Sequence, residues 1–219
     1  MYFHSFREFV GELLKIFKEK RFFYSVKYFC WIILDKIRGV DFIKNEGYEK
    51  VGTSQERSSV YQATRDTAYL KKVMKGLPIK STDAILDLGC GKGYMLKIFS
   101  KYAFFKVGGV ELSERLCEIA NRNIKKEKLE KCVVYHADAA EFCQYDEYTH
   151  IYMFNPFPAV VMEKVMENIK ESIIRVPRNM TIIYKGAFCH DIIVGNGIFE
   201  LSDVVNGKTL SYYIYKSRV

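Results

Sequence analysis

The segment ILDLGCGKGYML, residues 85–96, holds the residues whose types and spacing most clearly could do chemistry. An apolar run reaches Asp87 and then enters a turn with three glycines, Gly89, Gly91 and Gly93. Glycines let a backbone turn sharply and approach a ligand where a Cβ atom would collide. Ligands of doubly wound sheets bind outside the carboxyl ends of the strands. The turn therefore predicts a site for a nucleotide or a nucleotide-like cofactor.

Three classes of cofactor compete for this turn. A phosphate-binding P-loop is excluded, because it needs a glycine where this chain has Leu86. A dinucleotide fingerprint is disfavoured, because its third glycine is replaced by Tyr94. An acid directly before the turn, Asp87, repels a diphosphate and attracts an ammonium group. The turn therefore favours a cofactor with a cationic part.

Two more carboxylates follow the next two predicted strands. Glu111 ends the segment VGGVE, where a carboxylate can accept both hydroxyl hydrogens of a ribose. Asp138 follows the third strand, where it can accept from the exocyclic amine of adenine. With Asp87, these acids predict a site for an adenosine that carries a cationic amino-acid tail.

From about residue 61 to the C-terminus, the chain resembles the class I S-adenosylmethionine-dependent methyltransferases. The motifs DLGCGKG, GVELS and ADAAEF occur in order, and a predicted hairpin ends the chain. The resemblance implies S-adenosylmethionine as the cofactor and S-adenosylhomocysteine as its product. It also implies a segment that folds over the cofactor. The implied cofactor-binding residues are Tyr61, Thr64, Asp87, Gly89, Gly91, Gly93, Glu111, Leu112, Asp138, Ala139 and Asn155.

The fourth predicted strand ends in Asn155-Pro156-Phe157-Pro158. This end resembles the Asn-Pro-Pro-aromatic motif of amino-group methyltransferases, and most closely the FNPF strand end of small bacterial methyltransferases. The resemblance implies that Asn155 is catalytic and accepts a hydrogen bond from the acceptor. The alternative is that Asn155 only caps the following helix. Because position 155 is an amide and not an acid, we predict no metal.

The pattern of short apolar strands and amphipathic helices predicts an α/β, Rossmann-like fold. We expect a doubly wound, mostly parallel seven-stranded sheet that ends in an antiparallel hairpin, signalled by Asn206-Gly207. Strands are predicted over 84–88, 105–111, 132–136, 149–154, 180–184, 198–205 and 209–215. Helices are predicted over 61–75, 94–102, 113–125 and 159–174.

Residues 1–58 are predicted to be an N-terminal helical extension and linker, and residues 59–219 the methyltransferase domain. Apolar residues recur at helical spacing in residues 1–40, with mostly basic residues between them, which predicts two amphipathic helices. Residues 41–58 lose this periodicity and predict a connecting loop. Such helices can pack on a second copy or lie in a membrane interface, so a homodimer and a peripheral membrane contact through residues 1–40 both stay open.

Composition narrows the setting and the function. The six cysteines form no CxxC pair, the chain shows no secretory signal, and its longest charge-free run is too short to span a membrane, so we expect a cytoplasmic protein, with peripheral membrane contact left open. The net charge of +8 selects no partner, and nucleic acid is disfavoured as the acceptor. We predict methyl transfer to a nitrogen or oxygen of an unidentified acceptor. The rivals are a nicotinamide-dependent oxidoreductase and a non-catalytic cofactor-binding protein that docks to a membrane or partner.

Overall fold

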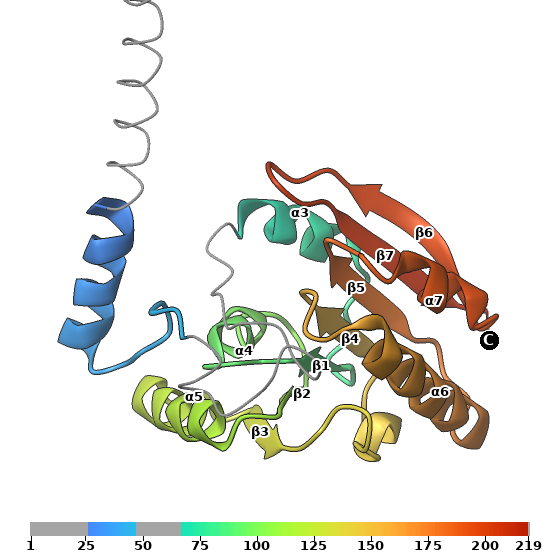
Figure 1. Cartoon of the computed structure of the whole chain (residues 1–219), viewed down its shortest axis with the longest axis horizontal. Coiled ribbons are helices and arrows are strands. Elements are labelled where there is room, and N and C mark those ends of the chain that lie inside the picture. The colour runs from blue at the N-terminus through green and yellow to red at the C-terminus, as the bar shows by residue number, and fades with distance from the viewer. Residues whose placement is uncertain (1–25, 47–66, 219) are drawn as a thin grey trace, which may run out of the picture.

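A seven-stranded sheet forms the centre of the protein (Figure 1). The computed structural model describes residues 26–46 and 67–218. The strands are β1 (Ala84–Leu88), β2 (Lys106–Glu111), β3 (Cys132–His136), β4 (His150–Met153), β5 (Thr181–Lys185), β6 (Phe199–Val205) and β7 (Tyr212–Ser217). Their order in the sheet is β3-β2-β1-β4-β5-β7-β6. Only β7 runs antiparallel to its neighbours β5 and β6, which confirms the predicted mixed sheet.

The order of the strands reverses beside β1. This strand pairs in parallel with β2 on one side and with β4 on the other. All five of its residues are buried, as expected for a central strand covered on both faces. The reversal is the topological switch point of a doubly wound sheet, where a ligand site is expected.

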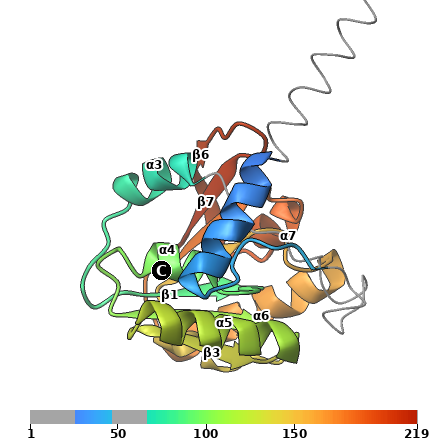
Figure 2. The same ribbon diagram turned by 90° about the vertical axis from the view of Figure 1, so that its left-hand side faces the viewer.

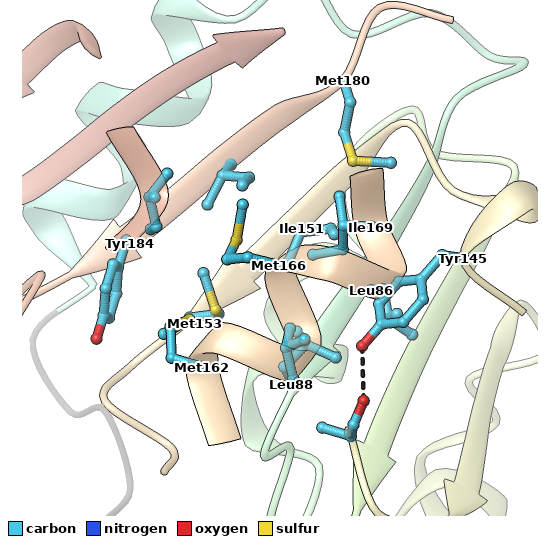
Figure 3. Close-up of a cluster of buried hydrophobic side chains, with 14 of the residues drawn as sticks. Leu86, Leu88, Tyr145, Ile151, Met153, Met162, Met166, Ile169, Met180 and Tyr184 are labelled. Atoms are coloured by element: carbon cyan, nitrogen blue, oxygen red, sulfur yellow. Dashed lines mark hydrogen bonds between the residues drawn. The ribbon is translucent and has the colours of Figure 1, made fainter. Parts of the chain in front are cut away.

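Helices cover both faces of the sheet, as a doubly wound fold requires. The helices are α3 (Ala68–Gly76), α4 (Tyr94–Phe99), α5 (Glu114–Glu127), α6 (Ala159–Arg175) and α7 (His190–Gly195), with a 3-10 turn, η1 (Gln144–Glu147). One core cluster packs strand side chains against α6, where Leu88 and Met153 face Met162 and Met166 (Figure 3). The other packs residues of α3 and α4 against the opposite face.

Most predicted elements differ from the structure by a few residues at one or both ends, and one helix was not predicted. Helix α4 ends at Phe99 and not at residue 102, because the chain tightens there into bonds from Lys101 N–H to the Ile98 carbonyl and from Tyr102 N–H to the Phe99 carbonyl. The helix α7 was not predicted, because only six residues form it.

The terminal hairpin is confirmed, but its turn is longer than predicted. Val205 pairs with Tyr212, so six residues, 206–211, join the strands. A tight Asn-Gly turn needs positive φ at both central residues, and Gly207 does not adopt it. A Cβ atom on Gly207 would meet the carbonyl oxygen of Leu210, because the chain folds back on itself here.

The described part of the N-terminal extension is a helix over residues 26–38 and a short irregular segment after it. The predicted first helix, the rest of the linker and the boundary at residue 58 lie outside the described residues. Residues 40–46, called the N-terminal strap below, are not a solvated loop, since Phe42, Ile43 and Glu46 are buried. Among the described residues, no helix is long and apolar enough to cross a bilayer.

Candidate functional site

The glycine turn connects β1 to α4 and lies against β2 and β4. Gly89, Gly91 and Gly93 have φ angles of 77°, 54° and 79°, a region that other residues rarely adopt. A Cβ atom on Gly89 would lie 2.5 Å from the Cβ of Pro156. The Gly89 N–H donates to the carbonyl of Val110 at 2.9 Å. Glycine is therefore required both for the backbone shape and for the close approach of the β4 end.

Glu111, at the end of β2, holds the turn in place. Its Oε2 accepts from the Gly91 N–H at 2.8 Å, and its Oε1 accepts from the Ser113 N–H at 2.9 Å. A carboxylate can accept about four hydrogen bonds, so each oxygen keeps acceptor capacity for a ligand. Burial raises the pKa of Glu111, and these backbone hydrogen bonds oppose the shift. The predicted neighbour Leu112 is half-buried, and its carbonyl lies 3.1 Å from Nε2 of His136.

Asp87 is the most buried acid of the site, with 3% of its surface exposed. Burial, and then the charge of Glu111, raise the pKa of Asp87 well above its usual value. Two carboxylates in one buried place disfavour each other's ionisation. A cationic group bound beside them would relieve this repulsion, so the electrostatics suit an ammonium ligand.

The third strand supplies Asp138 and Ala139. Oδ1 of Asp138 accepts from the Ala140 N–H at 2.9 Å, which fixes the half-buried carboxylate at the start of a turn. Ala139 is buried, and its carbonyl accepts from the hydroxyl of Tyr145 at 3.0 Å (Figure 3). This segment is therefore anchored by the core and places an acid beside the carboxyl end of β3.

Asn155 follows β4 in a strained conformation, with φ of 41°. Its Oδ1 accepts from the Phe188 N–H at 3.4 Å, and a Cβ atom on Gly186 would lie 2.5 Å from its Nδ2. Asn155 and the segment after β5 therefore pack together. The N-cap of α6 is Pro158, so the alternative that Asn155 caps this helix is wrong.

The sheet brings the predicted residues of the four strand ends to one edge. The strands that carry them, β3, β2, β1 and β4, are consecutive neighbours in the sheet. Tyr61 and Thr64 lie outside the described residues. Within residues 26–46 and 67–218, no cluster of three side chains could hold a metal ion.

Comparison with known proteins agrees with this geometry. Residues 85–178 match the family model for a methyltransferase domain. Over these residues the chain is similar to methyltransferase domains. The match includes the glycine turn, Glu111, Asp138 and Asn155, and so spans all four strand ends.

Several proteins of known sequence or structure are similar to this chain. A protein of Methanococcus maripaludis named "Probable cobalt-precorrin-6B C(15)-methyltransferase (decarboxylating)" is 27% identical over 114 residues, which are 50% of this chain. The match spans 62% of that relative's length. A methyltransferase of Aquifex aeolicus has a TM-score of 0.55 at 19% identity, over 71% of this chain and 94% of that one. Magnesium protoporphyrin IX methyltransferase of Synechocystis, solved with bound S-adenosylmethionine, has a TM-score of 0.52 at 14% identity, over 70% and 77%. These structures share the fold of the domain.

Two residues beside the site were missed in the sequence. Lys92, inside the glycine turn, is fully buried, and Asn123 of α5 is only 2% exposed. Both bind the N-terminal strap. A lysine between glycines is unremarkable in a sequence, because loop lysines usually reach solvent. Nothing in the residue pattern indicated that Lys92 and Asn123 bind the N-terminal strap, which lies far before them in the chain.

Proposed function

We propose that the protein transfers a methyl group from S-adenosylmethionine to a nitrogen or oxygen of an acceptor. The observation that carries the proposal is the pair of buried carboxylates, Asp87 and Glu111, beside the glycine turn. Such a pair suits the ammonium and the ribose of this cofactor, and the acid at position 138 suits its adenine. Gly89, Gly91, Gly93, Leu112 and Ala139 would line the same site, with Tyr61 and Thr64 from the segment outside the described residues.

The chain's own residues would act mainly by position. When bound, the cofactor supplies a methyl group that is already activated on a sulfonium, so a strong base is not essential. Asn155 would accept a hydrogen bond from an N–H or O–H acceptor, which favours these acceptors over carbon. Holding nucleophile and methyl group in line can account for most of the rate. The backbone of Asn155 is strained, as is common at functional sites, and its amide packs against the segment after β5.

Isothermal titration calorimetry with S-adenosylhomocysteine tests the proposal. We expect the wild-type protein to bind this product in the micromolar range. Glu111→Ala removes the ribose acceptor and leaves the N–H groups of Gly91 and Ser113 without their partner. We expect its affinity to fall by about tenfold or more, since a hydrogen bond to a charged group contributes roughly 1.5–3 kcal/mol.

Glu114→Ala is the matched control, because Glu114 is exposed at the start of α5. It should bind like the wild type. Binding of NADH in place of S-adenosylhomocysteine would favour the oxidoreductase. Binding without transfer of labelled methyl groups to any acceptor in a lysate would favour the non-catalytic cofactor-binding protein.

We also propose that the helix over residues 26–38 makes a peripheral contact with an anionic membrane. One side of this helix, which includes Trp31 and Ile32, packs on the strap. The opposite side exposes large apolar residues, namely Val26, Phe29, Ile33, Leu34 and Ile37. Its exposed charges, Lys27, Lys36 and Arg38, are all basic. A basic amphipathic helix suits anionic lipid, whereas a second copy would bring the same net charge of +8.

Sedimentation with lipid vesicles tests this contact. We expect the full chain to bind phosphatidylglycerol vesicles at low salt and not phosphatidylcholine vesicles, since the attraction is partly electrostatic. Phe29→Gln with Ile37→Gln should abolish this binding, because these are the most exposed apolar residues of the helix. Ile174→Gln, on the exposed side of α6, is the matched control and should change nothing. No vesicle binding, together with a dimer in analytical ultracentrifugation, would assign the face to a second copy instead.

A further inference from the structure

Lys92 joins the glycine turn to the N-terminal strap. Its side chain is fully buried. Its Nζ donates to Oδ2 of Asp41 at 2.8 Å, to the carbonyl of Lys44 at 2.8 Å and to Oε1 of Glu46 at 3.0 Å. An ammonium group has three donors, and these three acceptors all belong to the strap.

The burial of this ammonium makes the two segments depend on each other. A buried charge is costly unless it is paired and hydrogen-bonded. Burial alone raises the pKa of Glu46, but the hydrogen bond and the charge of Lys92 outweigh it and lower the pKa. The Glu46 side chain is only 3% exposed. If the strap left, the Lys92 charge would lose these three acceptors, which would destabilise the present form of the turn.

Asn123 of α5 ties the backbones of the same two segments. Its Nδ2 donates to the carbonyl of Lys92 at 3.0 Å and to the carbonyl of Asp41 at 3.0 Å, and its Oδ1 accepts from the Asp41 N–H at 2.9 Å. One buried side-chain amide thus fixes the turn and the strap at once. Lys92 is therefore held at both its carbonyl and its ammonium group.

Apolar contacts extend the attachment to the first turn of α4. Phe42 is 1% exposed, and its ring lies edge-on to Tyr94 with centroids 5.8 Å apart. Tyr94 is the residue directly after Gly93. Oδ2 of Asp35 accepts from the N–H groups of Phe42 and Ile43, which joins the strap to the preceding helix. In Figure 2, this helix and the strap lie in front of the face that carries α4 and α5.

We infer that Lys92 is a positioning residue that makes the N-terminal strap part of the cofactor site, so that docking of the strap and binding of the cofactor favour each other. The inference rests on the proposed function. Lys92 acts through the turn: its neighbour Gly91 is the residue whose N–H is bound by Glu111. Coupling of this kind is reciprocal, so the cofactor must stabilise the strap as much as the strap stabilises cofactor binding.

Hydrogen exchange and calorimetry on the full chain test the coupling, with S-adenosylhomocysteine as the probe. In the wild type, we expect the probe to slow amide exchange at Phe42 and Ile43. Lys92→Met keeps the length of the side chain and removes its charge and donors. We expect its affinity for the probe to fall by roughly 5- to 150-fold, the usual range of such couplings. Exchange in residues 40–46 should be faster and no longer respond to the probe. A purely structural role would not produce this loss of response.

Two further variants keep the test decisive. Lys106→Met removes a lysine that pairs with Glu147 at the other end of β2, and it should bind the probe like the wild type. Glu46→Gln leaves an acceptor for Lys92 but removes the charge. We expect it to weaken binding of the probe and to speed exchange in residues 40–46, as Lys92→Met does, but to a smaller extent. This milder variant carries the test if Lys92→Met does not fold.

The outcomes separate this inference from the proposed function. Wild-type affinity in both Lys92→Met and Glu46→Gln overturns the coupling alone. The coupling is also overturned if amide exchange in residues 40–46 of the wild type does not change when the probe binds. A wild-type protein that does not bind S-adenosylhomocysteine overturns the proposed function, and the coupling with it.

Discussion

Gly89→Ala is expected to destabilise the protein by about 2–5 kcal/mol and to remove measurable binding of S-adenosylhomocysteine. The backbone of Gly89 has φ of 77°, where a residue with a Cβ atom costs roughly 1–2 kcal/mol. The new Cβ atom would also lie 2.5 Å from the Cβ of Pro156, and overpacking of this kind costs about 1–3 kcal/mol. Relief of this contact requires the glycine turn and the end of β4 to move apart. That movement would separate the proposed cofactor site from Asn155.

Two other glycines serve as matched controls for Gly89→Ala. A Cβ atom on Gly76, the last residue of α3, would meet nothing within 4 Å, so Gly76→Ala should stabilise by roughly 0.5–1 kcal/mol. Gly197 has φ of 82° but open space around it, so Gly197→Ala isolates the backbone cost. Urea unfolding measures all three, and calorimetry measures binding. If Gly89→Ala and Gly197→Ala cost the same, the contact with Pro156 contributes nothing.

The site residues could be predicted because their positions follow from a simple geometric rule. Each one stands at the end of an apolar run, and parallel strands bring their carboxyl ends to one edge of the sheet. Gly89, Glu111, Asp138 and Asn155 are far apart in the chain but lie at or just after the ends of consecutive strands of the sheet. Two strands, Ala84–Leu88 and Cys132–His136, were predicted without error. The ligand roles of these residues stay predictions.

The parts that could not be predicted depend on contacts between distant segments. The strap has no helical or strand period, so it resembles a linker in the sequence, and only its contacts with Lys92 and Asn123 show that it is packed. The Asn206-Gly207 pair predicted a tight turn, but the pairing of Val205 with Tyr212 requires a longer connection. Local sequence signals identify a turn more reliably than the register of the strands it joins.

Asp87→Asn is expected to stabilise the free protein and to weaken its binding of S-adenosylhomocysteine. Burial, with the charge of Glu111, raises the pKa of Asp87 in the folded state. Between the ordinary carboxyl pKa and this raised pKa, the folded protein binds more protons than the unfolded chain, so wild-type stability falls as pH rises through that window. Asparagine has no such charge to bury. Above the window, Asp87→Asn should therefore melt several degrees higher than the wild type.

The same change removes the proposed partner of the cofactor's ammonium group. Loss of a charge-assisted hydrogen bond of roughly 1.5–3 kcal/mol lowers affinity by about 10- to 150-fold. Because a bound ammonium favours the carboxylate form, wild-type affinity should rise with pH through the raised pKa of Asp87, and binding should release a proton. Burial raises the pKa of Glu111 too, so the diagnostic quantity is the difference in pH profile between wild type and Asp87→Asn. Asp203→Asn, at an exposed position of β6, is the matched control for melting and binding. A variant that is less stable than the wild type at neutral pH, or that binds with the same affinity and pH profile, would show that Asp87 is structural and that the ammonium is held elsewhere.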